Sequence, residues 1–418
     1  MIQQNNDKNI LLTRLLLSLS ILVFIRIGTF LPVPGINHGH LAFYLERHSM
    51  TKSLVSTFAG NNTFVIGLFT LNIFPYINAS ILMQLLISLF PSLSKLQKEG
   101  GGEGRRTINK LTRLITLGWA LIQSFSIAFY LKRALFDWDI YLAAQIMIWL
   151  TTGAMIVLWL SEIITEYGLG NGASLLIYTN IVSNLPNIGK NLVTQTTENV
   201  ALSSWGFIVA LFFVAIYGIV LLQEGTRVVP LISSKQLTKM TESVSSSGLV
   251  ENNYIPLRFN QAGVMPIILT TSFLVIPNYL INLGIFQSLN FLINFKWIYW
   301  IGYFVLILAF SSFYSSIVLN PKDISDQLQK SAVKIPGVRP GVQTIFYLKQ
   351  EIQRITLMGA TLLAFITIIP NFIESTLNIT SLNGLSTTSF LILGGVVLDL
   401  KREVSNIYFS EIYTDMYR

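Results

Sequence analysis

The sequence predicts an all-α polytopic membrane protein with ten transmembrane helices. Ten apolar stretches, most of them about as long as a bilayer is thick, follow one another along the 418 residues. The composition is 52% hydrophobic and 11% charged, a balance that excludes a soluble domain of this length. Lys and Arg are frequent in every second connecting loop and scarce in the others.

The predicted spans are apolar runs separated by polar or basic loops. In chain order they cover residues 10–31, 64–90, 111–131, 140–161, 172–186, 202–223, 261–283, 296–320, 352–373 and 385–400. About 20 apolar helical residues cross a hydrocarbon core of about 30 Å, so most of these runs can cross. The fifth and tenth are short, and we expect them in the protein interior rather than against lipid.

Basic residues indicate the orientation of the chain. They lie mainly in the loops that follow spans two, six and eight and at both chain ends. The positive-inside rule therefore predicts both termini on the cytoplasmic side or on its equivalent in an organelle.

Ten spans divide into two halves of five, residues 1–186 and 187–418. Because five crossings is an odd number, the second half begins on the opposite side, and an internal repeat would be inverted. The second spans of the halves read FPYINASILMQLL and VMPIILTTSFLVIP, each with a proline followed by small polar residues. Proline and glycine are also common in membrane helices generally, so an inverted repeat and a chance similarity both remain open.

Residues that carry chemistry are rare within the predicted spans. Cysteine is absent, and the three histidines lie in the first outer loop, where a solvated loop is favoured over a metal site. Glu162, Glu224 and Asp399 fall at span ends, so ion-coupled transport is not expected. The sequence predicts no catalytic residue, metal or cofactor. It favours a passive conduit over a secondary transporter for a small solute or an intramembrane enzyme.

The start of the chain and its amino-acid composition indicate which genome encodes the protein. No cleavable signal or transit peptide is evident before the first span, as expected for a bacterial protein or one encoded in its own organelle. Asn, Ile, Phe and Lys, which AT-rich codons encode, are abundant and favour a plastid genome.

Eight motifs in order resemble the SecY family of protein-conducting channels. They read RIGTFLPVPGI, TFAGNN, FPYINASILMQLL, LQKEGGGEGRRTIN, SEIITEYGLGNGASLLI, IPLRFNQAGVMP, VLNPKDISDQLQKS and IPGVRPGVQT. The resemblance covers nearly the whole chain. It implies two inverted five-helix halves around a central pore, which passes unfolded preproteins and releases apolar segments sideways into lipid.

The resemblance implies a ring of aliphatic side chains at the waist of the pore. The matching residues are Ile73, Ile77, Ile177, Ile181, Ile268 and Ile392. Two pairs are spaced by four residues, so each pair lies on one helical face. Any one isoleucine would fit a lipid-facing or core position, but their joint occurrence on interrupted helices favours the ring. Stiff β-branched side chains can form a dry constriction that parts for a peptide.

Two further elements follow from the resemblance. Residues 53–64, with Phe58, Gly60 and Asn61, match the plug helix of the family, the alternative being a plain outer loop. The lateral gate would place three residues of span two against three of span seven. These are Asn78, Ile81 and Gln84 against Thr271, Ser272 and Ile276. Polar pairs in membranes are weak enough to open, but these side chains would equally serve as static contacts between helices.

The basic loops 224–260 and 321–354 are the predicted docking surface for a ribosome or a SecA-type motor ATPase. Arg339 lies between two Pro-Gly pairs, and Arg227 and Lys235 match weaker family positions. Membrane topology or anionic lipid would also account for basic loops. The loop after span six has scattered basic residues where relatives carry runs of arginine, which leaves ribosome docking open.

The resemblance also implies partners and a location. The expected partners are a SecE-like small membrane subunit, a SecG-like subunit, preproteins with signal sequences, and membrane lipid. The expected location is the plastid thylakoid membrane, with the bacterial cytoplasmic membrane as the alternative.

Overall fold

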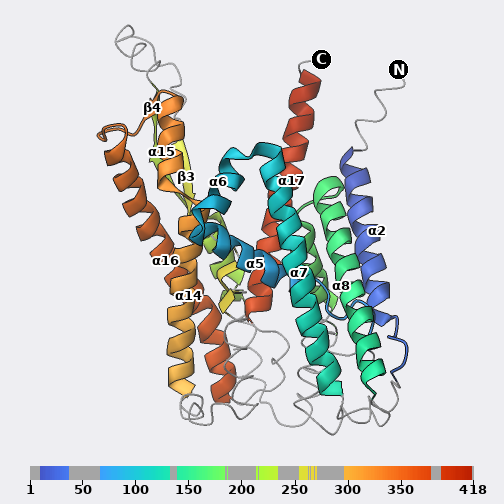
Figure 1. The fold of residues 1–418 in the computed structure, drawn as a ribbon. Helices are drawn as coiled ribbons and strands as arrows, with labels where there is room; N and C mark the ends of the chain where they lie inside the picture. The colour runs from blue at the N-terminus through green and yellow to red at the C-terminus, as the bar shows by residue number, and fades with distance from the viewer. Residues whose placement is uncertain are drawn as a thin grey trace. The chain divides into compact units, whose positions relative to one another are not determined.

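Figure 1 shows the secondary structure of the computed structural model along the chain. The chain comprises two compact units. The structure describes residues 10–36, 66–131, 139–183, 186, 213–214, 216–233, 254–261, 263, 265–267, 269–270, 296–377 and 387–416. The first unit comprises Met1–Glu198 and Val396–Arg418, and the second comprises Asn199–Gly395. The inverted relation between residues 1–186 and 187–418 stays a prediction.

The first unit is built from helices that pack along their lengths. They are α2 (Ile10–Phe30), α5 (Phe74–Leu89), α6 (Pro91–Glu99), α7 (Gly101–Leu131), α8 (Ile140–Tyr167) and a short helix, Gly172–Ser183. Helix α7 packs against α5 and α8, and α2 packs against α8. Apolar residues such as Ile127, Ile146 and Leu150 form the buried core between these helices.

A turn fixes where α5 begins. Residues 66–73 approach α8 so closely that a Cβ at Gly153 would overlap the backbone carbonyl of Leu68. Asn72 has a positive φ of 48°, and its Oδ1 accepts a hydrogen bond from the Ile73 N–H at 2.8 Å. Among the described residues of the predicted span 64–90, the helix therefore begins at Phe74.

A bend separates α5 from α6. Phe90 is extended, with φ −104° and ψ 109°, and Pro91 is the first residue of α6. A residue before proline is disfavoured in the helical region, so α5 ends there. The two helices differ in direction by 107°.

The second unit combines long helices with two short antiparallel sheets. Its helices include α14 (Lys296–Val318), α15 (Pro321–Lys330) and α16 (Val342–Leu377). Strand β1 (Thr226–Pro230) pairs with β3 (Tyr254–Arg258), and β2 (Ile232–Ser233) pairs with β4 (Val333–Lys334). These strands lie in the basic loops 224–260 and 321–354, where no strand was predicted from the sequence.

One buried hydroxyl pair joins two long helices in each unit. In the first unit, the side-chain oxygens of Ser124 on α7 and Thr151 on α8 are 3.1 Å apart. In the second, those of Ser315 on α14 and Thr356 on α16 are 2.7 Å apart. Hydroxyl groups inside a membrane bundle find partners on a neighbouring helix because lipid supplies none.

Five of the described helices are long and apolar enough to cross a membrane, and α5 with α6 would add a sixth crossing. The five helices correspond to the predicted spans one, three, four, eight and nine, and the pair α5–α6 corresponds to span two. The helix Gly172–Ser183 is short, as the fifth span was predicted to be. Spans six and seven lie largely outside the described residues, so the count of ten is an expectation from the sequence.

Several helices extend beyond the apolar run that predicted them. Helices α7 and α16 each begin ten residues before the predicted span. Helix α7 begins at residue 101, where the span was predicted from 111, and α16 begins at residue 342, where the span was predicted from 352. Helix α17 (Thr387–Met416) continues sixteen residues past the predicted end, at 416 against 400, and contributes to both units. Hydropathy finds the part of a helix in lipid, whereas the helix itself continues into water.

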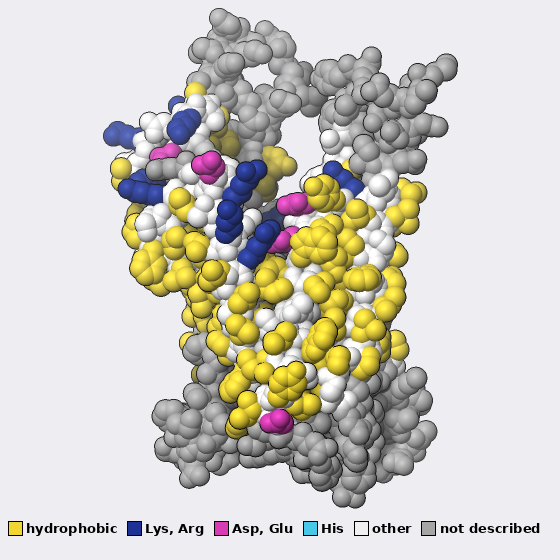
Figure 2. Space-filling view, turned by 45° about the vertical axis from the view of Figure 1, so that its right-hand side comes forward, with side chains coloured by type: hydrophobic (Ala, Val, Ile, Leu, Met, Phe, Trp, Pro, Cys, Tyr) yellow, Lys and Arg dark blue, Asp and Glu magenta, His cyan; other side chains and the backbone are white. Residues whose placement is uncertain are grey.

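The outward faces of the helices are apolar. On α2, Leu12, Leu16, Leu19, Phe24 and Ile27 are each more than half exposed. Figure 2 shows hydrophobic side chains covering the described helices along most of their length. Such a surface is stable against lipid tails and not against water.

We predict that Gly153→Ala lowers the free energy of unfolding by about 1–3 kcal/mol, because the new methyl group must displace the Leu68 backbone. Gly118→Ala on α7 is the matched control, since a Cβ there meets no atom within 4 Å. Thermal unfolding of the purified protein in detergent measures both. Equal midpoints for the two variants would contradict the close approach.

Candidate functional site

Two predicted ring residues lie at the beginning of α5. Ile73 is 1% exposed and immediately precedes the helix, and Ile77 is 4% exposed in its first turn. The Ile77 N–H donates a hydrogen bond to the Ile73 carbonyl at 3.1 Å, so the two residues lie one helical turn apart. The turn at Asn72 and the close approach at Gly153 together fix this pair.

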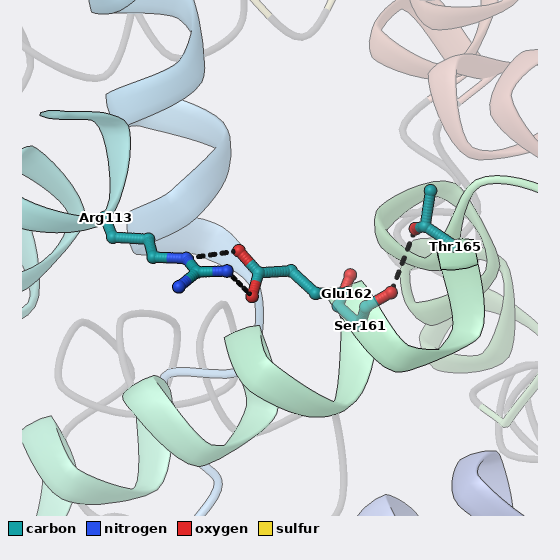
Figure 3. Close-up of polar contacts among 4 residues, drawn as sticks. All are labelled: Arg113, Ser161, Glu162 and Thr165. Atoms are coloured by element: carbon teal, nitrogen blue, oxygen red, sulfur yellow. Dashed lines mark hydrogen bonds and ion pairs between the residues drawn. The ribbon is translucent and has the colours of Figure 1, made fainter. Parts of the chain in front are cut away.

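The second pair, Ile177 and Ile181, is half-buried on the helix Gly172–Ser183. Thr165 joins this helix to the end of α8. Its hydroxyl donates a hydrogen bond to the Ser161 carbonyl at 2.9 Å and accepts one from the Gly172 N–H at 2.9 Å. Figure 3 shows the Ser161–Thr165 contact.

Gly172 is needed at this junction. A Cβ there would overlap the backbone carbonyl of Ser161. The glycine of the Asn-Gly pair therefore allows the short helix to begin directly against α8.

The remaining ring residues belong to the second unit. Ile392 is half-buried on α17, and Ile268 lies outside the described residues. The ring as a whole stays a prediction.

The gate and plug residues are described only in part. On α5, Ile81 is buried, and Asn78 and Gln84 are half-buried. The opposing Thr271, Ser272 and Ile276, and the plug residues Phe58, Gly60 and Asn61, lie outside the described residues. The gate and the plug stay predictions.

An ion pair that the sequence analysis missed joins α7 to α8 (Figure 3). Arg113 donates from Nε and Nη2 to the two carboxylate oxygens of Glu162, at 2.8 and 2.7 Å. The parallel geometry is the strong bidentate form of this pair. The residues are 49 positions apart on different helices, so no local pattern connects them.

Arg339 is exposed on a turn between β4 and α16. The Val338 N–H donates to the Ile335 carbonyl at 3.2 Å, closing a turn with Pro336 and Gly337 at its centre. Gly337 has a φ of +77°, which the third position of a type II turn requires. The first Pro-Gly pair thus fixes the chain just before Arg339.

The second Pro-Gly pair fixes the chain after Arg339. Gly341 has a φ of +98° and precedes α16, and its carbonyl accepts a hydrogen bond from the buried Ser325 hydroxyl at 3.4 Å. The Thr344 hydroxyl donates to the Arg339 carbonyl at 2.9 Å. The backbone of Arg339 is held from both sides while its side chain is exposed.

The other predicted docking residues differ in their surroundings. Arg227 lies on β1, and its Nη1 is 3.1 Å from Oε2 of Glu351 on α16. Arg354 lies on the other side of the same carboxylate, at 3.7 Å from Oε1. Lys235 lies outside the described residues. The sequence analysis did not single out Glu351.

Within the described part of the chain, no group of three His, Cys, Asp or Glu side chains is arranged to hold a metal ion. The site residues are aliphatic at the predicted waist and charged in the loops.

Known proteins share both the sequence and the fold. The family model described as SecY matches residues 67–401. A protein translocase subunit SecY from Trieres chinensis is 64% identical over 423 residues, covering 99% of this chain and 100% of that protein. The chain belongs to the SecY family.

Solved structures confirm the fold of this SecY-family chain. A SecY channel studied for its plug domain and closed state has a TM-score of 0.66 at 17% identity, covering 97% of this chain and 94% of that one. Sec61 in the canine ribosome–channel complex has a TM-score of 0.62 at 17% identity, with the same coverage. The predicted all-α membrane fold is confirmed, and the chain is an integral membrane protein.

We predict that Arg113 and Glu162 are energetically coupled by about 0.5–1 kcal/mol, because the pair is partly exposed. A double-mutant cycle of Arg113→Gln and Glu162→Gln, read by unfolding in detergent, measures the coupling. It should shrink in about 1 M salt, where exposed charges are screened. Additive effects in low salt would show that the pair contributes nothing.

Proposed function

We propose that this chain is the channel-forming subunit of a protein translocase, which passes unfolded preproteins across a membrane and releases apolar segments into lipid. The observation that carries the proposal is the 64% identity, over the full length of both chains, to a protein translocase subunit SecY. The family match over residues 67–401 supports it.

In this proposal the six isoleucines close the pore. Their side chains carry no charge, so a passing polypeptide is not retained and ions meet an apolar barrier. The burial of Ile73 and Ile77 supports a role in a closed constriction. The plug residues Phe58, Gly60 and Asn61 would add a second seal.

Lateral release would use the seam between Asn78, Ile81 and Gln84 and the residues of span seven. Hydrogen bonds between helices in membranes contribute about 0.6 kcal/mol each on average, so the apolar helix of a signal sequence can replace them. The half-buried Asn78 and Gln84 support this assignment.

The chain itself supplies no chemical energy in this proposal and is not an enzyme. Translocation would be driven by a SecA-type motor or by a ribosome, with SecE-like and SecG-like subunits beside the channel. The fold shared with Sec61 of a ribosome–channel complex supports the ribosome as a partner.

We place the protein in the plastid thylakoid membrane with both termini on the stromal side. The identity to an algal relative supports a plastid origin, and the basic loops support the orientation.

We predict that Ile77→Asn or Ile392→Asn allows export of precursors whose signal sequences are defective, because a polar side chain weakens the dry barrier. The measurement is protease-protected precursor in vesicles that hold the channel with its partner subunits. Ile77→Leu and Ile392→Leu, which keep the apolar volume, should retain selectivity. Ring residues would have to be reassigned if the Asn variants were equally selective.

We predict that Arg339→Glu reduces motor-driven export at least about tenfold, since reversing a charge at a contact typically costs several kcal/mol. Lys330→Glu makes the same charge change at an exposed position of the same loop and should reduce export far less. Unchanged export by the Arg339 variant would remove this residue from the docking surface.

A further inference from the structure

A buried carboxylate joins the two basic loops of the second unit. Glu351 on α16 is only 5% exposed and lies between Arg227 of β1, at 3.1 Å, and Arg354, at 3.7 Å. An apolar cluster takes its buried residues from both loops and from the part of α16 that carries Glu351. The buried members are Val229, Leu257, Ile335, Leu348, Ile352 and Ile355.

The strand register directs Arg227 toward this cluster. The antiparallel pair of strands β1 and β3 is called the hairpin here, although β2 lies between them in the chain. Arg227 pairs with Leu257 across the hairpin, and Val229 is two residues further along β1. Leu257 and Val229 are both buried, and residues two apart on a strand share a face. Arg227 therefore lies on the inner face of the hairpin, the face that packs against α16.

Arg258 provides the contrast. Arg258 pairs with Thr226, the residue before Arg227 on β1. Because successive residues of a strand point to opposite faces, Arg258 lies on the outer face, where it is exposed. The two arginines thus carry the same charge on opposite faces of one hairpin.

The environment of Glu351 makes the pair important for the position of the hairpin. A buried carboxylate is strongly unfavourable unless cations compensate it. Arg227 supplies the nearer cation from another element, while its own side chain keeps half of its surface exposed to water. The pair can therefore form only when the hairpin lies on α16.

The same cluster includes the start of the Arg339 turn. Ile335, whose carbonyl closes that turn, is a buried member of the cluster. Glu351 lies about two and a half helical turns into α16, which begins directly after Gly341. Hairpin, turn and helix therefore share one core.

We infer that Arg227 is a positioning residue: through Glu351 it holds the β1–β3 hairpin on α16 beside the turn that presents Arg339. It differs from a docking residue in that its charge is directed into the protein. This inference deepens the proposed function and rests on it for the consequence in translocation.

Hydrogen exchange tests the positioning itself. In the full chain with its partner subunits, Arg227→Gln should speed amide exchange in residues 226–230 and 254–258 by at least about tenfold, because it leaves Glu351 undercompensated. Adding Glu351→Gln removes the buried charge and should return exchange to within about threefold of the native rate. Arg258→Gln is the matched control and should leave exchange unchanged.

Export in vesicles tests the consequence. Arg227→Gln should reduce motor-driven export, and the double variant Arg227→Gln with Glu351→Gln should export more than Arg227→Gln alone. A residue that touched the partner directly would not be rescued by a second substitution in the core. Arg339→Glu should reduce export without changing exchange in the hairpin.

The two readouts separate the possible failures. Native exchange rates in Arg227→Gln, or no recovery in the double variant, would overturn the positioning inference. A second outcome combines amide exchange rates in the expected order with export that no variant changes, Arg339→Glu included. That outcome would support the positioning role of Arg227 and overturn the docking role of these loops.

Discussion

The absence of water inside the bilayer is the constraint on which the rest of this structure depends. Backbone groups must bond within helices there, and side chains that face outward must be apolar, as on α2. Polar groups inside must find partners on neighbouring helices. The pairs Ser124–Thr151 and Ser315–Thr356 meet this requirement with the same chemistry in the two units.

Charged side chains are distributed differently from these hydroxyl groups. Two carboxylates near the ends of the predicted spans are each paired with arginine. Glu162 receives a bidentate arginine, and Glu351 lies between two arginines. The predicted waist carries no charge, which suits a channel that must neither bind its cargo nor leak ions.

The crossings that the structure describes, the SecY-family fold and the turns at the two Pro-Gly pairs beside Arg339 could be predicted from the sequence, because hydropathy and Pro-Gly pairs act locally. The ion pairs could not, since Arg113 and Glu162 are 49 residues apart and only packing brings them together. The beginning of α5 at Phe74 depends on a close approach to Gly153, which hydropathy does not register. The strands were missed because their short, exposed segments carry no clear alternation.

The length of α16 has a mechanical consequence. Its candidate membrane-spanning part, Val342–Ile369, has 28 residues, which at about 1.5 Å per residue is about 42 Å. That exceeds a hydrocarbon thickness of about 30 Å, so this helix is long enough to cross a bilayer and still reach into the loop that carries Arg339. A force applied at the Arg339 turn would therefore pass directly into a continuous helix, since α16 begins immediately after Gly341.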